Sequence, residues 1–185
     1  MSTPETTGYA QIVERPSVLT TPMSELTMLA DLRMMPFRER IRKASQEQFD
    51  SHPDLFVPPK IYIASKADHR PRWRELKENR GFNIISRWIY TDDRFSVDPT
   101  DLDYTKLWKE CIEDVQACDT LVLYVEPGER LKGALVELGA ALGSNKEVIV
   151  TGDVGDNGTW WHNKKIQVSD KNVEQVLTYL YGQES

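Results

Sequence analysis

The sequence predicts a three-layer α/β sandwich of the flavodoxin-like or Rossmann-like kind, with a mostly parallel sheet of about five strands. From residue 60 onward, short apolar runs alternate with amphipathic segments, a pattern typical of parallel strands joined by crossover helices. The run "TLVLYV" at 120–125 is apolar throughout, as in a strand that is covered on both faces. These two observations together indicate the fold class.

The expected elements follow one another closely. Strands are predicted over 60–64, 82–86, 120–125, 147–152 and 164–168. Helices are predicted over 69–81, 104–118, 133–142 and 171–182, and residues 87–103 form a long loop. Gly81 ends the first helix, and the helix at 104–118 places Leu107, Cys111 and Val115 on one apolar stripe.

Three regions divide the chain. Residues 1–22, rich in Thr, Ser and Pro, are expected to form a flexible N-terminal arm. Residues 23–58 are expected to form a helical extension and linker, whose Met and Leu side chains pack on the domain or on a partner subunit. Residues 59–185 are the predicted α/β domain.

Composition excludes several classes of protein. The 185 residues are 39% hydrophobic and 28% charged, as in a globular protein, and the formal net charge of −6 argues against a nucleic-acid polymer as partner. No apolar run reaches the ~20 residues of a membrane span, and the N-terminus lacks the pattern of a signal peptide. We therefore expect a cytoplasmic protein with reduced cysteines, no metal site and no cofactor.

One acid is conspicuous, Glu137 in the small-residue run "GALVELGAAL". Parallel sheets bind ligands at the carboxyl ends of their strands, and Glu137 lies early in the helix after the central strand. A structural acid paired with Lys66, Arg130 or Lys132 is the alternative. The same rule selects other candidate substrate-binding residues on the segments that follow the strands: Ser65, Lys66, Trp88, Tyr90, Glu126, Arg130, Lys132 and Gly133.

Several of these residues, and some of their neighbours, also have a structural interpretation. Trp88 and Tyr90 could stack on a base or pack beneath the long loop. Ser65 could line a sugar pocket or end its strand for steric reasons. His69 is better explained as the start of a helix than as a general acid, and Asp119 as a strand-start residue. The Gly/Asp run at 152–158 reads as a mobile loop rather than as a nucleotide fingerprint.

The segment "CDTLVLYVEPGERLKGALVELGAALGSNKEVIVTG", together with "IYIASKADH", resembles the nucleoside 2-deoxyribosyltransferase superfamily and its nucleotide N-glycosidase relatives. The resemblance covers roughly residues 60–152. It implies that Glu137 is the nucleophile, which attacks the anomeric carbon of a nucleoside or nucleoside 5′-monophosphate and displaces the base. It also implies a homo-oligomer. Small neighbours such as Gly133 and Ala134 would leave room for the sugar, and the helix N-terminus would favour the ionised carboxylate.

The chain departs from this family at two supporting positions. Cys111 stands where the transferases carry an acid before the central strand, and Leu131 stands six residues before the nucleophile, where they carry an aspartate. Arg130 and Lys132 would suit a phosphate, which favours hydrolysis over transfer. Two alternatives remain: cleavage of a nicotinamide dinucleotide of the NAD type, and a nucleotide-binding or sensing module without turnover.

Overall fold

The computed structural model describes residues 57–91, 100–155 and 158–181, together with residues 28–29, 39, 43, 46–52 and 55. Two compact units, residues 1–34 and 35–185, make up the chain, and each is considered by itself. The arm predicted over 1–22 lies outside the described residues, as does most of the extension predicted over 23–58. Within that extension, α3 spans Gln46–Ser51. The predicted domain boundaries therefore stay a prediction.

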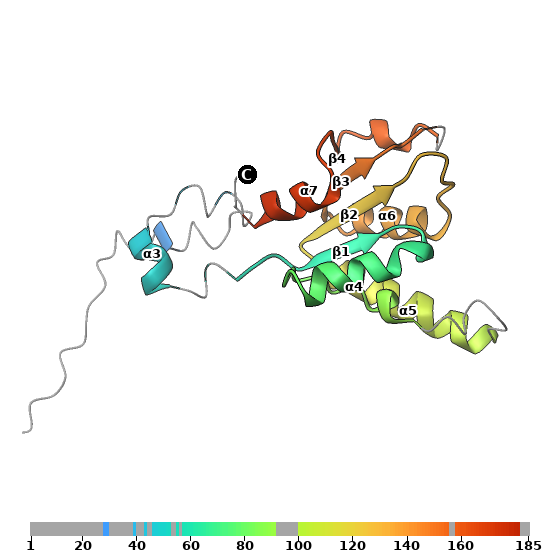
Figure 1. Ribbon diagram of the computed structural model, residues 1–185, viewed down its shortest axis with the longest axis horizontal. Coiled ribbons are helices and arrows are strands. Elements are labelled where there is room, and N and C mark those ends of the chain that lie inside the picture. Colours follow the sequence, from blue (N-terminus) through green and yellow to red (C-terminus); the bar gives the residue numbers. More distant parts are fainter. Residues whose placement is uncertain are drawn as a thin grey trace, which may run out of the picture. The chain divides into compact units, whose positions relative to one another are not determined.

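Four strands form one parallel sheet: β1 (Ile61–Ala64), β2 (Thr120–Val125), β3 (Glu147–Gly152) and β4 (Ile166–Ser169). They lie side by side in the order β1-β2-β3-β4, as Figure 1 shows. The register is continuous across the sheet, since Ile63 pairs with Val122 and Val122 pairs with Ile149. The predicted α/β class is confirmed, with four strands rather than about five.

The missing strand is the one predicted over 82–86. Its only ladder contact is an isolated parallel bridge between Ile61 and Ile84, on the outer side of β1. Beyond the bridge, side chains rather than backbone groups are the hydrogen-bond partners on this side of β1. The Ser86 hydroxyl accepts a hydrogen bond from the Ile63 amide at 2.7 Å, and the Trp88 indole donates to the Ile63 carbonyl at 2.8 Å. The outward-facing amide and carbonyl of Ile63 are thus satisfied without a further strand on this side of β1, so the chain is free to turn into a 3₁₀ helix.

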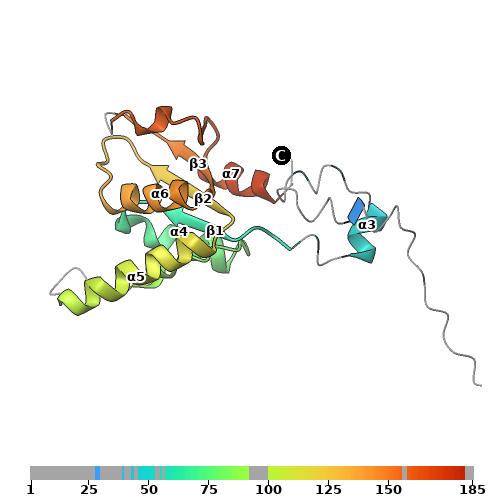
Figure 2. The ribbon, with the colours of Figure 1, turned by 180° about the vertical axis from the view of Figure 1, so that it is seen from behind.

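Helices cover both faces of the sheet. Figures 1 and 2 show α5 (Asp101–Ala117) and α6 (Gly133–Gly143) on one face, and α4 (Arg70–Glu78) and α7 (Val173–Leu180) on the other. Short 3₁₀ helices follow β1 (η2, Ala67–His69), precede the long loop (η3, Arg87–Tyr90) and precede β4 (η5, Trp160–His162). The arrangement is a Rossmann-like three-layer sandwich.

Local signals explain where two helices begin. α5 starts three residues earlier than predicted, because the Thr100 side chain accepts from the Asp103 amide while the Asp103 side chain accepts from the Thr100 amide. Asn172 and Gln175 form the same reciprocal pair at the start of α7. Such capping satisfies amides that have no partner within the helix.

The core consists of β1, β2 and β3 with the inner faces of the helices. All four residues of β1 are buried, which places the Tyr62 side chain inside the protein. Gly152 ends β3 at φ +97°, and a Cβ at this position would overlap the carbonyl oxygen of Val125 at the end of β2. This close approach brings the ends of the two central strands together. Both cysteines, Cys111 and Cys118, are free and buried, as predicted.

Within the part of the chain that the structure describes, no helix has both the length and the apolar character needed to cross a membrane.

Candidate functional site

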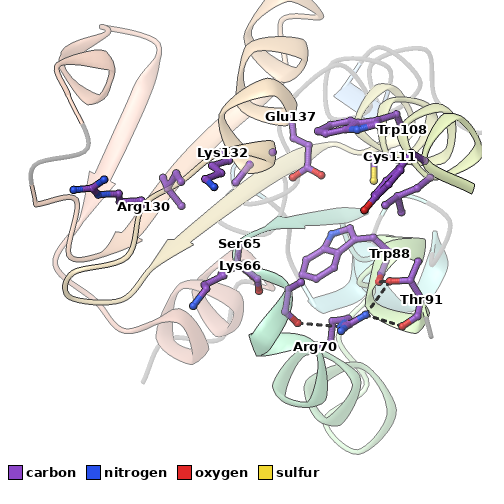
Figure 3. A pocket seen from close by; sticks show the side chains of 16 residues that line it. Ser65, Lys66, Arg70, Trp88, Thr91, Trp108, Cys111, Arg130, Lys132 and Glu137 are labelled. Atoms are coloured by element: carbon purple, nitrogen blue, oxygen red, sulfur yellow. Dashed lines mark hydrogen bonds between the residues drawn. The ribbon is translucent and has the colours of Figure 1, made fainter. Parts of the chain in front are cut away.

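A cavity of about 440 Å³ lies at the carboxyl edge of the sheet, beside the first turns of α6 (Figure 3). Its volume is in the range of small-molecule sites. The segment after β1, the helix η3, one face of α5 and the start of α6 supply its walls. Among the described residues, the lining comprises Ser65, Lys66, Ala67, Arg70, Trp88, Thr91, Tyr104, Leu107, Trp108, Cys111, Arg130, Leu131, Lys132, Gly133, Ala134 and Glu137.

Glu137 is the one carboxylate in this described lining. It is the fifth residue of α6, it is 7% exposed, and its side chain points into the cavity (Figure 3). The Tyr62 hydroxyl, which comes from β1, donates a hydrogen bond to Glu137 Oε1 at 2.9 Å. Lys66, a predicted alternative partner, forms its ion pair with Asp68 at 2.8 Å instead. The carboxylate is therefore buried beside a phenol rather than a cation.

Burial raises the pKa of Glu137 to about 7, and hydrogen bonds from Tyr62 and Cys111 partly oppose that rise. Low polarity disfavours the charged carboxylate, whereas donors directed at its oxygens favour it. The sequence argument expected the helix N-terminus to keep Glu137 ionised. That effect fades beyond the first helical turn, and desolvation outweighs it here. Glu137 is thus poised between its acid and carboxylate forms near neutral pH.

Cys111 stands on α5 in contact with the same carboxylate (Figure 3). Burial raises the pKa of its thiol to about 12, so the sulfur is protonated at neutral pH. Burial and the charge of Glu137 also raise the pKa of Tyr62, which keeps the phenol neutral. Two neutral donors, Tyr62 and Cys111, therefore contact Glu137. Of these, Cys111 stands at the position where the family resemblance implies a second acid.

Two tryptophans form apolar walls. The indole nitrogen of Trp88 donates to the Ile63 carbonyl, which fixes this ring, 8% exposed, in the cavity wall. Trp108 on α5 is 38% exposed and packs against the start of α6. A Cβ at Gly133 would lie 3.2 Å from the Trp108 ring, so the close packing of this ring, as well as access for a sugar, favours glycine there.

Cationic side chains outnumber acids in the described lining, which includes Lys66, Arg70, Arg130 and Lys132. Arg70 is 8% exposed and donates to the Ala67 carbonyl at 3.0 Å and to the Thr91 carbonyl at 2.8 Å. Arg130 and Lys132 are exposed on the segment that leads into α6, and Figure 3 shows Arg130 on the side of the view away from Trp108 and Cys111. An excess of four cationic residues over one carboxylate in the described lining favours an anionic ligand.

Seven of the substrate-binding and catalytic candidates come together at the cavity: Ser65, Lys66, Trp88, Arg130, Lys132, Gly133 and Glu137. Ser65 accepts from the Trp73 indole at 2.8 Å and donates to the Lys66 carbonyl at 3.1 Å. Its hydroxyl therefore also has a structural role.

Two predicted site residues lie outside the lining that the structure describes. Tyr90 is 47% exposed, donates to Glu78 at 2.9 Å and lies beneath the Lys77 ammonium, 5.2 Å from the ring centroid. It sits on the outer side of η3, because the 3₁₀ turn directs Trp88 inward instead. Glu126 accepts from the Tyr124 hydroxyl at 2.9 Å and faces His69.

Sequence reasoning missed several residues of the site, among them Tyr62, Arg70 and Trp108. A tyrosine in the otherwise aliphatic strand "KIYIA" was the available signal for Tyr62, since a buried phenol needs a hydrogen-bond partner. Trp108 looked like any aromatic residue of an amphipathic helix. Asp119, by contrast, has the structural role that was favoured, because it accepts from the Lys60 amide at 2.8 Å ahead of β2.

Comparisons of this chain with known protein families and with curated proteins find no match. The resemblance to the nucleoside 2-deoxyribosyltransferase superfamily thus stays a prediction that rests on the residues quoted above.

Proposed function

We propose that this protein cleaves the N-glycosidic bond of a nucleoside 5′-monophosphate, with Glu137 as the nucleophile. The observation that carries this proposal is a single buried carboxylate, held by Tyr62, that points into a cavity with aromatic walls and cationic residues. The aromatic rings suit a base, and the cations suit a phosphate. The family resemblance supplies the reaction that joins the two.

The ionised Glu137 attacks C1′ of the sugar, and the bond from C1′ to the base breaks. The base leaves with that electron pair and takes a proton from solvent, while a glycosyl ester forms on Glu137. Water then attacks C1′, which restores the carboxylate and leaves a hydroxyl group on the sugar. Two displacements at one carbon give net retention of configuration.

The residues around Glu137 support the first displacement. The Tyr62 hydroxyl holds Oε1 in a defined orientation, and the dry surroundings leave the carboxylate poorly solvated. A carboxylate that is less stabilised by water is a stronger nucleophile once ionised. The four cations offset the charge of the phosphate, so that an anionic substrate can approach an anionic nucleophile.

The test is incubation with a panel of nucleosides, their 5′-monophosphates and NAD, with free base followed by chromatography. We expect base release from a monophosphate, and a loss of at least about a thousandfold in Glu137→Gln. Glu75→Gln, an exposed acid on α4, is the matched control and keeps full activity. Release that persists in Glu137→Gln would contradict the proposal.

Other outcomes would identify the two alternatives. Release of nicotinamide from NAD alone would indicate a dinucleotide glycohydrolase. Thermal stabilisation by a nucleotide without any release would indicate a binding or sensing module.

The pH dependence provides a second test. Because only the ionised Glu137 attacks, kcat/KM should rise about tenfold per pH unit below pH 7 and level off above it, following the raised pKa of about 7. The measurement is kcat/KM for the best substrate between about pH 5 and about pH 9. A profile that is flat down to about pH 5 would show that the carboxylate has its ordinary pKa.

A further inference from the structure

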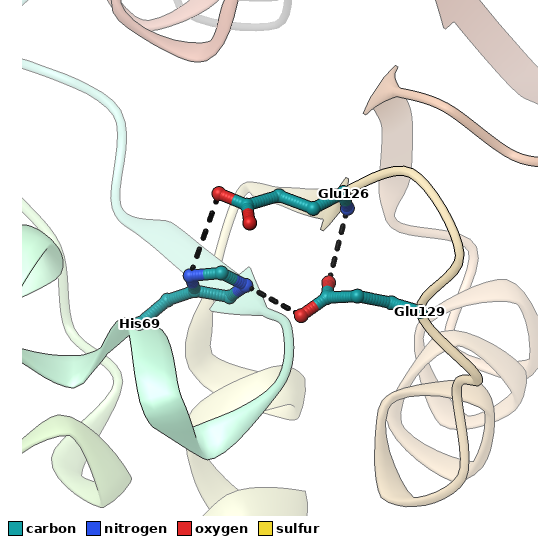
Figure 4. A group of neighbouring side chains, drawn as sticks. All are labelled: His69, Glu126 and Glu129. Carbon is teal, nitrogen blue, oxygen red and sulfur yellow. Dashed lines mark hydrogen bonds and ion pairs between the residues drawn. The ribbon is translucent and has the colours of Figure 1, made fainter.

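We propose that His69 is a positioning residue, which fastens the segment after β1 to the turn after β2 and thereby sets the spacing of the cationic side chains across the cavity. This inference rests on the proposed function, because it concerns how the same site holds a phosphate. It assigns a role to a cluster outside the described cavity lining: His69, Glu126 and Glu129 (Figure 4).

The central contact joins His69 Nε2 to Glu129 Oε1 at 2.9 Å. A carboxylate can only accept, so Nε2 carries the proton and donates it. The other oxygen of Glu129 accepts from the Glu126 backbone amide at 3.0 Å, which fixes the carboxylate from both sides (Figure 4). The His69 and Glu129 side chains are only 12% and 11% exposed. A charge-assisted bond this well shielded from water is stronger than a surface ion pair.

Both partners are held rigidly by their surroundings. Glu126 and Glu129 are the ends of a tight turn, closed by a 3.1 Å hydrogen bond from the Glu129 amide to the Glu126 carbonyl. Gly128 adopts φ +76° inside it, as a type II turn requires at its third position. The His69 ring meets the Tyr124 ring edge-on, with the centroids 5.3 Å apart.

The chain positions on either side of this contact explain why it matters for the cavity. Lys66 and Arg70 flank His69 in the sequence, and Arg130 directly follows Glu129. These three cations line the cavity, whereas His69 and Glu129 are not among its described lining residues. The bond between them therefore acts through its neighbours. Glu137 rests on different supports, Tyr62 from β1 and Cys111 from α5.

A metal ion is the competing interpretation, since the donor atoms of the three side chains lie within 4.8 Å of one another. The ring, however, presents a different nitrogen to each acid: Nε2 faces Glu129 at 2.9 Å, and Nδ1 faces Glu126 at 3.8 Å. One ion coordinates one nitrogen of an imidazole. The geometry is that of a histidine hydrogen-bonded to Glu129, with Glu126 beside the other ring nitrogen.

The experiment compares His69→Ala, which removes the donor, with His69→Gln, whose amide nitrogen can replace Nε2. His162→Ala, an exposed histidine on η5, is the matched control. For the nucleoside 5′-monophosphate that is turned over, His69→Ala should raise KM about tenfold and leave kcat within about twofold. His69→Gln should restore KM to near the wild-type value. A parallel fall in kcat, or no rescue by glutamine, would overturn the proposal.

Two further measurements keep the test independent of turnover. Hydrogen exchange should accelerate in His69→Ala at the backbone amides of residues 66–70 and 126–132, but not in α7, and should return to normal in His69→Gln. Unchanged exchange would overturn the positioning role even if no base is released by the wild type. Titration with Mn²⁺ or Zn²⁺ by calorimetry should show no specific binding, whereas binding that is lost in His69→Ala would establish a metal ligand instead.

Discussion

Glu137 connects the chemistry of the site to the stability of the fold. The folded protein holds the Glu137 proton up to about pH 7, whereas the unfolded chain releases it near the ordinary value of 4.5. A raised pKa in the folded state means that the stability associated with the neutral acid is complete below pH 4.5 and is lost as pH rises through 7. At alkaline pH the protein therefore carries a destabilising charge at its candidate nucleophile.

Glu137→Gln should remove this destabilising charge. The amide is neutral at every pH, and its oxygen still accepts from Tyr62. We expect the free energy of unfolding of the variant to exceed that of the wild type by about 3 kcal/mol at pH 8 and to match it near pH 4.5, from the pKa of about 7. Urea denaturation at the two pH values measures this.

Glu75→Gln, which is exposed, should change the same quantity by no more than about 0.5 kcal/mol. Equal stability of Glu137→Gln and the wild type at pH 8 would mean that water reaches the carboxylate.

At the scale of elements, the ends of β2 and β3 are locked together at Gly152. Its φ of +97° is one that side chains rarely adopt, and an added Cβ would meet the Val125 carbonyl. Because the backbone itself is the obstacle, no rotamer change can relieve the overlap. The end of β2, which leads into the Glu126–Glu129 turn, depends on this contact.

Gly152→Ala should lower the free energy of unfolding by about 3 kcal/mol or more, as expected for a side chain forced against the backbone at a positive φ. Gly139→Ala is the matched control: it lies within α6, where a Cβ meets nothing within 4 Å. That substitution should stabilise by about 0.5–1 kcal/mol through helix propensity. Chemical denaturation of both variants measures these changes. An unchanged free energy of unfolding in Gly152→Ala would contradict the close approach of Gly152 to the Val125 carbonyl.

The contact that replaces the strand predicted over 82–86 can be tested in the same way. Ser86→Ala leaves the buried Ile63 amide without its 2.7 Å partner, which should cost about 1–3 kcal/mol of unfolding free energy. Ser144→Ala, at an exposed position after α6, should be nearly neutral. If both substitutions changed the free energy of unfolding equally little, a backbone carbonyl of residues 84–86 would have to accept the hydrogen bond from the Ile63 amide instead.

At the scale of the whole molecule, charge is distributed unevenly. The chain carries a formal net charge of −6, yet four cations and one acid are found among the described cavity residues. A generally acidic surface repels anions, so a local reversal of sign selects where an anion can bind.

A nucleoside 5′-monophosphate should therefore stabilise the protein in thermal unfolding more than the uncharged nucleoside does. Its dissociation constant should rise roughly fivefold between about 0.02 M and about 0.5 M NaCl, because salt screens the attraction. Calorimetric titration measures the dissociation constants of both ligands. Arg130→Gln should weaken the binding of the monophosphate only. Arg80→Gln, at an arginine that follows α4 and is not among the described lining residues, should change the binding of neither ligand.

Much of the architecture was predictable because it depends on local patterns. Strands β2 and β3 begin and end where alternation and apolar runs place them. The error at 82–86 arose because the segment is apolar enough for a strand, while the side chains of Ser86 and Trp88 compete for the same bonds. Only three-dimensional contact with Ile63 reveals that competition.

The sequence by itself determined the order of the elements and the place of Glu137 near the carboxyl edge of the sheet, because hydrophobic periodicity and parallel topology are properties of the linear chain. The tertiary structure alone decided what surrounds that acid. Tyr62 lies 75 residues away along the chain, and its hydroxyl meets Glu137 only through the packing of β1 against α6. Burial by these elements, rather than the neighbours on its own helix, moves the pKa of Glu137 to about 7.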